Sequence, residues 1–309
     1  MHSISICLTD KCSASCQHCC MSCSPNCDNI LDQEKIIEIL NQIKNNDKIT
    51  VINITGGEPF LLYDFLKKIL YSISSMKKRA TLVTNGFWAN SQKIAEEKLL
   101  ELSNCGLKTL SVSLSHFHQE YINIDNIRNI ISAARQLPID INLKVAVTKD
   151  KMAFDLLSQL GDDIIDVPLC FFSVAPVGRA KNINKENFIQ KYDSKKWMRC
   201  TDKELVIYNN GDCYPCCSPA IFDTCFKIGN VFETPLDELM HRVDCNLLLH
   251  YLRKKGVNWF KDILTNDFNY HFNKLYESPC VLCADIFKDY NTLELLTPYL
   301  KKDYEKNKL

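Results

Sequence analysis

The chain has 309 residues, and its 37 basic residues balance 37 acidic ones, so its formal net charge is zero. This balance argues against a general nucleic-acid binder and against an electrostatic membrane anchor. No apolar run approaches the roughly 18 residues of a membrane helix, and the N-terminus lacks a signal-peptide pattern. We therefore expect a cytoplasmic protein with no nucleic-acid or membrane partner.

Strand and helix patterns alternate along the first 174 residues. Apolar runs predict strands over residues 3–8, 50–55, 80–84, 108–114, 140–147 and 164–174. Helical spacing predicts a helix that begins after Asp32 and others over residues 62–76, 91–104, 124–136 and 151–160. Six such units predict a parallel sheet, as a partial barrel or a doubly wound sheet, with sites at the C-terminal ends of its strands.

The pattern changes near residue 195. Asn210-Gly211 is a strong turn signal and predicts a hairpin of residues 204–208 and 212–215. Apolar spacing predicts helices over residues 235–255, 258–264 and 290–304. We therefore predict a division into a barrel, residues 1–194, and a small C-terminal module, residues 195–309.

Cysteine is the unusual residue of this chain, with 17 in total. Disulfides are rare in a reducing cytoplasm, and the cysteines are clustered rather than spread. Clustered cysteines without a secretion signal are typical of metal or iron–sulfur sites. We expect the isolated ones to be buried packing residues, namely Cys7, Cys105, Cys170 and Cys245.

The first cluster is Cys12-x3-Cys16-x2-Cys19, directly after the first strand. Three thiolates on one tight loop can hold three irons of a [4Fe–4S] cube and leave the fourth open to a substrate or cofactor. The alternative is a structural zinc loop, which usually needs four ligands in paired Cys-x2-Cys elements. The loop continues with three more cysteines, Cys20, Cys23 and Cys27, which could bind a further metal ion.

A second motif, Gly56-Gly57-Glu58-Pro59, ends the strand over residues 50–55. Glycines let the backbone approach a ligand closely, and Glu58 can accept a hydrogen bond from an ammonium group. The motif lies at the same edge of the predicted sheet as the cysteine loop. Either motif alone is weak evidence for a functional site, whereas the two together are strong evidence.

Together these motifs resemble the radical S-adenosylmethionine (radical SAM) superfamily. The resemblance implies a partial (β/α)6 barrel, with Cys12, Cys16 and Cys19 holding a [4Fe–4S] cluster whose open iron binds SAM. It implies that Gly56–Pro59 meets the methionine amino group, and that His18 replaces an aromatic residue that covers the adenine. It also implies a one-electron reductant, and contacts to the rest of SAM from Thr84, Asn85, Ser113, Gly178 and Arg179.

The C-terminal module has its own cysteine set. The predicted hairpin brings Cys200 near Cys216, and the chain returns Cys280 and Cys283 to them. Four cysteines can enclose an auxiliary [4Fe–4S] cluster, with zinc as the alternative, and the pattern resembles a shortened SPASM extension. Cys213 could replace Cys216 as a ligand, although the Gly211-x4-Cys216 spacing favours Cys216.

Cys217 follows a predicted ligand directly. Adjacent residues on a strand point to opposite faces, so Cys217 is expected to be a free thiol, or alternatively a small buried hydrophobe. Segments 16–20, 84–88 and 214–222 resemble the epipeptide epimerases, which convert L- to D-residues in ribosomally made precursor peptides. That resemblance implies hydrogen return from Cys217, whose burial would keep it protonated, assisted by Glu204.

The implied reaction begins when the 5′-deoxyadenosyl radical takes a Cα hydrogen from the peptide. The planar Cα radical then receives a hydrogen atom from the thiol on the opposite face. The alternative is a radical SAM maturase that forms a thioether or another cross-link. Because the first strand begins at about residue 3, we expect no N-terminal peptide-recognition domain, and leader recognition by the barrel mouth or the C-terminal module.

Overall fold

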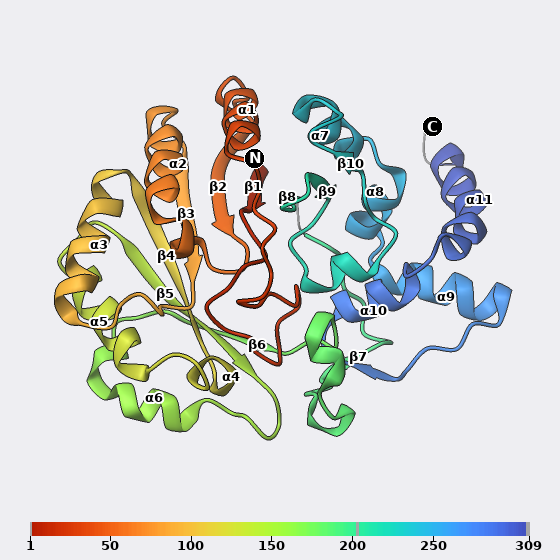
Figure 1. Ribbon diagram of the computed structural model, residues 1–309. Coiled ribbons are helices and arrows are strands. Elements are labelled where there is room, and N and C mark those ends of the chain that lie inside the picture. Colours follow the sequence, from red (N-terminus) through yellow and green to blue (C-terminus); the bar gives the residue numbers. More distant parts are fainter. Residues whose placement is uncertain (1, 202–203, 307–309) are drawn as a thin grey trace.

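The computed structural model describes residues 2–201 and 204–306, and its centre is a sheet of nine strands (Figure 1). Their order is β10-β9-β8-β1-β2-β3-β4-β5-β6. Six parallel strands form the partial barrel: β1 His2–Cys7, β2 Ile49–Thr55, β3 Arg79–Thr84, β4 Leu107–Leu114, β5 Asp140–Val147 and β6 Leu169–Ser173. The predicted partial barrel is confirmed.

Most helices cover the outer face of the barrel, and their bounds lie close to the predicted ones. The helices of the barrel are α1 Gln33–Lys44, α2 Tyr63–Ser75, α3 Gln92–Asn104, α4 His116–Gln119, α5 Ile124–Ala134 and α6 Phe154–Leu160. The short helix over residues 116–119 was not predicted, and it follows the fourth strand directly. Asp32 caps α1 by accepting from the Glu34 and Lys35 amides. The apolar stripe of α1 is buried against the sheet, where each such side chain contributes about 1.5–3 kcal/mol.

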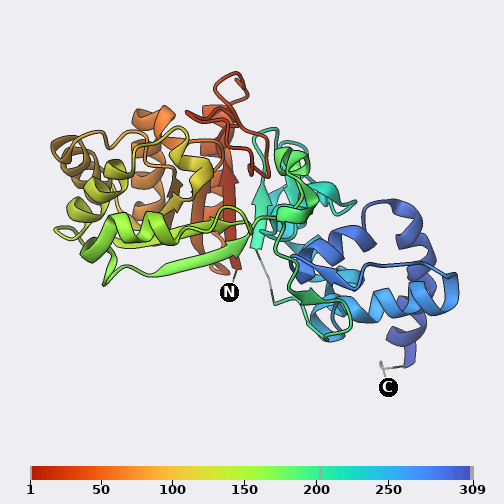
Figure 2. The same ribbon diagram turned by 90° about the horizontal axis from the view of Figure 1, so that it is seen from below.

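The sixth strand is shorter than predicted. Residues 161–164 form a 3-10 turn, and Pro168 stands directly before the strand, so β6 covers only Leu169–Ser173. In the view of Figure 2, β6 runs along the margin of the barrel.

The C-terminal segment adds three strands to the barrel sheet. They are β8 Glu204–Ile207, β9 Asp212–Tyr214 and β10 Gly229–Asn230. β8 lies parallel to β1 and pairs Ser3 with Glu204, while β9 returns antiparallel, as the hairpin prediction requires. The sheet therefore crosses the predicted boundary at residue 195, and the division of the chain into two domains stays a prediction.

The remaining C-terminal elements form a helical layer beside these strands (Figure 2). They are α7 Leu236–Asp244, α8 Leu247–Lys254, α9 Val257–Phe268, α10 Pro279–Ile286 and α11 Tyr290–Lys306, with a two-stranded sheet of β7 Tyr192–Asp193 and β11 Leu275–Tyr276. The single helix predicted over residues 235–255 is wrong. Asn246 starts a second helix there, because its side chain accepts from the Leu249 amide.

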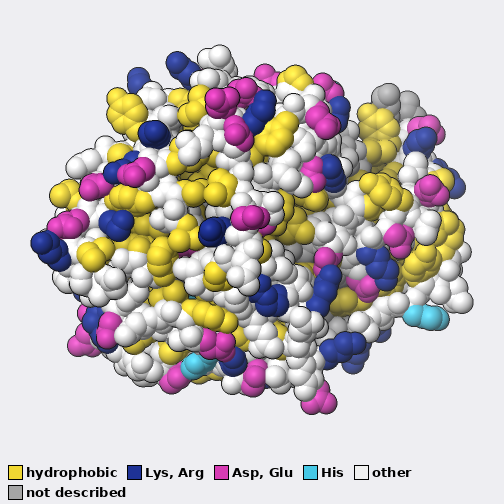
Figure 3. Space-filling model, in the orientation of Figure 1, with side chains coloured by type: hydrophobic (Ala, Val, Ile, Leu, Met, Phe, Trp, Pro, Cys, Tyr) yellow, Lys and Arg dark blue, Asp and Glu magenta, His cyan; other side chains and the backbone are white. Residues whose placement is uncertain are grey.

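The surface agrees with the neutral composition. Acidic and basic side chains are interspersed on the face shown in Figure 3. Within residues 2–201 and 204–306, no helix combines the length and the apolar character needed to span a membrane.

Candidate functional site

The two N-terminal motifs are locked together through their backbones. The Gly57 amide donates to the Thr9 carbonyl at 2.6 Å, and the Glu58 amide donates to the Lys11 carbonyl at 2.9 Å. A Cβ atom on Gly57 would lie only 2.1 Å from the Lys11 oxygen, and Gly56 has a φ of +133°. Glycine is therefore required at both positions, because the start of the cysteine loop packs directly against them.

A second contact holds the same loop from the other side. The Arg179 guanidinium donates to the carbonyls of Cys16 at 2.8 Å, Ser22 at 2.7 Å and Cys23 at 2.8 Å. The Arg179 amide donates to the Cys19 carbonyl at 3.0 Å. A Cβ atom on Gly178 would lie 2.1 Å from the Cys20 oxygen. Gly178 and Arg179 therefore clamp the cysteine loop and do not line the cavity beside it, and their predicted contact with SAM stays a prediction.

That cavity has a volume of about 270 Å³ and lies at the C-terminal ends of the strands. It brings together nine of the predicted residues: Cys12, Cys16, His18, Cys19, Gly56, Gly57, Thr84, Asn85 and Ser113. Asn85 orients the wall by donating to the Ser13 hydroxyl at 3.0 Å and contacting the Cys12 sulfur at 3.6 Å. A polar wall facing three thiols fits a cluster with an exchangeable polar ligand.

Glu58 does not line this cavity. Its carboxylate is fully buried and accepts from the Phe60 amide at 3.1 Å, the Thr84 hydroxyl at 2.9 Å and the Asn85 amide at 2.7 Å. Burial raises the pKa of Glu58 to about 7. In this structure the side chain ties the ends of β2 and β3 together, and its predicted acceptance from an ammonium group stays a prediction. Pro59 is buried at the start of a 3-10 turn, Pro59–Leu62.

Two histidines form the aromatic side of the cavity. His18 stacks on Phe117 with ring centroids 4.8 Å apart, and its edge meets His118 at 4.7 Å. Burial lowers the pKa of His18 to about 4 and holds the pKa of His118 well below its ordinary value, so both rings are neutral at pH 7. The His18 Nδ1 atom is buried, and none of the described residues forms a hydrogen bond with it. A neutral aromatic ring with an unused hydrogen-bonding nitrogen is suited to contact a nucleobase such as adenine.

Sequence reasoning missed several cavity residues. Cys23 lines the cavity and donates to Cys19, and this hydrogen bond is the main reason why the pKa of Cys19 falls to about 6. Residues 172–175, at the end of β6, form another wall. The rule that sites gather at strand ends could have found residues 172–175, but no spacing rule distinguishes Cys23 from its neighbours.

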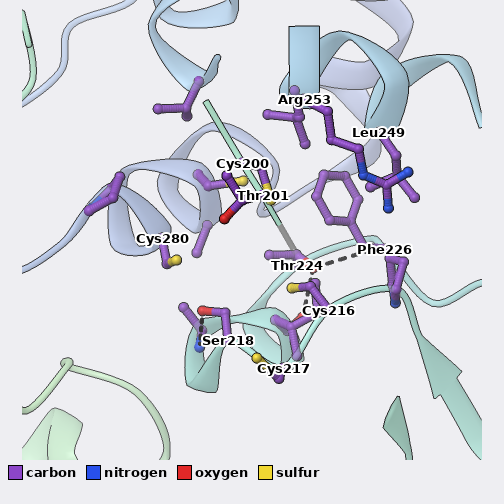
Figure 4. A pocket seen from close by; sticks show the side chains of 18 of the residues that line it. Cys200, Thr201, Cys216, Cys217, Ser218, Thr224, Phe226, Leu249, Arg253 and Cys280 are labelled. Carbon is purple, nitrogen blue, oxygen red and sulfur yellow. Dashed lines mark hydrogen bonds between the residues drawn. The ribbon is translucent and has the colours of Figure 1, made fainter. Parts of the chain in front are cut away.

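A second cavity, of about 550 Å³, collects the C-terminal cysteines (Figure 4). Three separate segments contribute the cysteines that line it, namely Cys200, Cys216 and the pair Cys280 and Cys283. Burial and the neighbouring thiols hold the pKa of Cys283 well above its ordinary value. Cys280 and Cys283 share one face of α10, whose first turn is capped by Ser278.

Cys213 lies elsewhere. Its side chain is fully buried in the hydrophobic core, and its thiol donates to the Gly211 carbonyl at 3.4 Å.

Among the four isolated cysteines, only Cys7 is buried. Cys105 is half-buried and packs against the hydrophobic core, whereas Cys170 and Cys245 are exposed, so the expectation of buried packing residues is wrong for the last two.

Cys217 departs from two expectations. β9 ends at Tyr214, so Cys216 and Cys217 are not on a strand, and both line the second cavity. Cys217 is exposed rather than buried. Pro219, only two residues later, lines the first cavity. The segment over residues 215–220 therefore contributes to both cavities, with Cys217 beside Cys216 (Figure 4).

Glu204 points into the barrel from β8. Its carboxylate is buried and accepts from the Ser5 hydroxyl and the Asn53 side-chain amide, in a network that continues to Thr81. Its predicted association with the Cys217 thiol stays a prediction.

Across the part of the chain that the structure describes, no three His, Cys, Asp or Glu side chains converge closely enough to bind one metal ion. Five cysteines line each cavity, among them the three predicted ligands of the first cluster and the four of the second, and both volumes can take a polynuclear cluster.

The comparisons with known proteins agree with this geometry. The radical SAM superfamily matches residues 6–141, and the iron–sulfur cluster-binding domain SPASM matches residues 199–285. The Bacillus subtilis (strain 168) protein described as "Putative peptide biosynthesis protein YydG" is 36% identical over 311 residues, covering 98% of each chain.

Two solved structures show the same fold. Streptococcus suis SuiB bound to S-adenosylmethionine has a TM-score of 0.59 at 17% identity, covering 81% of this chain and 67% of that one. Native anSMEcpe with bound AdoMet and Cp18Cys peptide has a TM-score of 0.58 at 14% identity, covering 99% of each chain. The chain therefore belongs to the radical SAM superfamily, with SAM and one [4Fe–4S] cluster in its barrel and a second [4Fe–4S] cluster in its C-terminal iron–sulfur domain.

Proposed function

We propose that this enzyme is a peptide epimerase that converts L- to D-residues in a ribosomally made precursor peptide. A peptide substrate is supported by the full-length similarity to the B. subtilis protein whose description names peptide biosynthesis. The observation that carries the epimerase assignment is Cys217, an exposed thiol beside a predicted cluster ligand, on the segment that lines both cavities.

Each of the two cavities contains the proposed cysteine ligands of one cluster. Cys12, Cys16 and Cys19 hold the first cluster, and Cys200, Cys216, Cys280 and Cys283 hold the second. Gly56, Gly57, Thr84, Asn85 and Ser113 form the SAM pocket. Glu58, Gly178 and Arg179 position this pocket from outside, because their groups are bonded to the chain itself.

When bound, SAM and the first cluster supply the carbon-centred oxidant that removes a Cα hydrogen from the peptide. Cys217 then donates a hydrogen atom to the opposite face of the planar carbon, so that a C–H bond forms as the S–H bond breaks. An electron from a one-electron reductant and a proton from water restore the thiol. Because Cys217 is exposed, water can supply that proton directly.

A cross-linking maturase is the second candidate, and the comparisons are equally consistent with it. Cross-linking would remove two hydrogens from the peptide, whereas epimerisation removes none in total. The two reactions therefore differ in product mass and in the need for a thiol donor.

The test is chiral amino-acid analysis of a hydrolysed precursor peptide after reaction with holoenzyme, SAM and a reductant. We expect D-residues from the wild type and from Cys245→Ala, which removes another exposed thiol. We expect none from Cys217→Ala, although this variant still cleaves SAM. D-residues formed by Cys217→Ala would refute the assignment.

A further inference from the structure

Strand β6 forms one edge of the nine-stranded sheet. It pairs with β5 on one side only, from Leu143 with Leu169 to Val147 with Ser173. Within residues 2–201 and 204–306, no strand pairs with its other side. Figure 2 shows β6 at the margin of the barrel.

The hydrogen-bond pattern identifies the backbone groups on this open side. The Leu143 amide donates to the Pro168 carbonyl at 2.9 Å, and the Val174 amide donates to the Val147 carbonyl at 3.0 Å. Because groups of alternate residues point to opposite sides of a strand, Cys170 and Phe172 also face β5. The amides and carbonyls of Leu169, Phe171 and Ser173 therefore face outward.

The side chains of β6 do not protect this edge. Proteins usually blunt an open edge with charges, prolines within the strand or a covering element. Residues 169–173 contain neither a charge nor a proline. Phe171 is 47% exposed and Phe172 is 41% exposed, on opposite faces of the strand. An uncharged, aromatic edge of this kind is suited to pairing with another extended chain.

The edge leads directly into the SAM cavity. Phe172, Ser173, Val174 and Ala175 line that cavity, so the last outward-facing residue of the edge lies at its wall. The Ser173 hydroxyl is buried there and has no hydrogen-bond partner among the residues that the structure describes. A chain paired along β6 would therefore pass from the open edge to the place where a hydrogen atom is removed.

We propose that the peptide substrate binds as an added strand along the outer edge of β6, hydrogen-bonded to the Leu169, Phe171 and Ser173 backbone. This inference rests on the peptide substrate of the proposed function, but not on the type of product. Pairing of this kind recognises the backbone and leaves side chains to be selected at alternate positions. It also holds the substrate extended, so that one Cα is presented to the cavity.

The first test is hydrogen exchange at single-amide resolution. The holoenzyme with SAM, but without reductant, is mixed with a synthetic precursor peptide that stimulates SAM cleavage. The Phe171 and Ser173 amides should exchange rapidly in the free enzyme and become protected with the peptide. The Phe172 amide, already bonded to β5, should be protected in both states. A peptide that stimulates SAM cleavage but leaves the Phe171 and Ser173 amides unprotected would overturn the proposal.

A second copy of this chain is the other possible occupant. In that case the Phe171 and Ser173 amides would already be protected without peptide, and sedimentation would show a dimer. This outcome would also reject the proposal.

The second test changes the peptide rather than the enzyme, so the fold of the enzyme is unaffected. N-methylation, one residue at a time, should weaken binding about tenfold at alternate positions of the paired segment and little between them. If the loss of binding did not alternate from one peptide position to the next, strand pairing would be contradicted. If pairing is observed but the product is cross-linked, the edge assignment stands and the epimerase assignment fails.

Discussion

The clamp formed by Arg179 gives the most quantitative prediction. Three hydrogen bonds join its guanidinium to carbonyls of the cysteine loop, and no single neutral side chain can replace them. We therefore consider Arg179→Met, which keeps much of the apolar stem, and Arg179→Lys, which keeps the charge but not the planar fork of donors.

The magnitude follows from the three bonds. A hydrogen bond to a charged group contributes about 1.5–3 kcal/mol when buried. Arg179 is only half-buried and water can reach part of the loop, so we reduce the sum to about 3 kcal/mol. This corresponds to a roughly hundredfold larger population of the opened loop. Arg179→Lys should lie between Arg179→Met and the wild type.

The assay is the rate at which a chelator removes iron from the first cluster, in protein whose second cluster is removed by mutation. Arg135→Met is the matched control, because Arg135 also bonds a carbonyl and a carboxylate but caps the end of α5 and contacts Asp163 and Asp166 rather than the cysteine loop. Iron loss from Arg179→Met at the rate of the wild type and the control would refute the clamp.

Three further predictions concern the cluster sites and their support. Cys216→Ala should halve the iron and sulfide content, whereas Cys213→Ala should keep both and lower only thermal stability, because Cys213 packs in the core. The raised pKa of Glu58 means that the folded state binds its proton more tightly. The free energy of unfolding should therefore fall by about 3 kcal/mol as pH rises from roughly 4.5 to 7, and urea titrations of Glu58→Gln should lack this change. Gly57→Ala places a Cβ atom 2.1 Å from the Lys11 carbonyl oxygen, so the variant should lose the first cluster but keep the second, as measured by iron content and electron paramagnetic resonance.

Strands and motifs on the barrel were predictable because their signals are local. Buried apolar runs alternate with amphipathic helices, and each motif follows a strand, so the shared edge of the sheet follows from the order of elements alone. The gathering of Cys12, Cys16 and Cys19 with Gly56 and Gly57 is of this kind.

Contacts between distant segments were not predictable in the same way. Nothing near Arg179 in the sequence indicates that its guanidinium holds carbonyls more than 150 residues away, and the close approach at Gly178 exists only in the folded chain. The exposure of Cys217 was missed because the strand was assumed to continue past Tyr214. The break at Asn246 was missed because the apolar spacing of α7 and α8 is nearly continuous.

The most direct test of the central claim is the mass of a precursor peptide after reaction in deuterated water. A thiol exchanges its hydrogen with solvent, so Cys217 should return deuterium and add about one mass unit per converted residue. Cys217→Ala should cleave SAM without adding this label. A product that has lost two hydrogens and carries no deuterium would contradict the epimerase assignment and establish cross-linking instead.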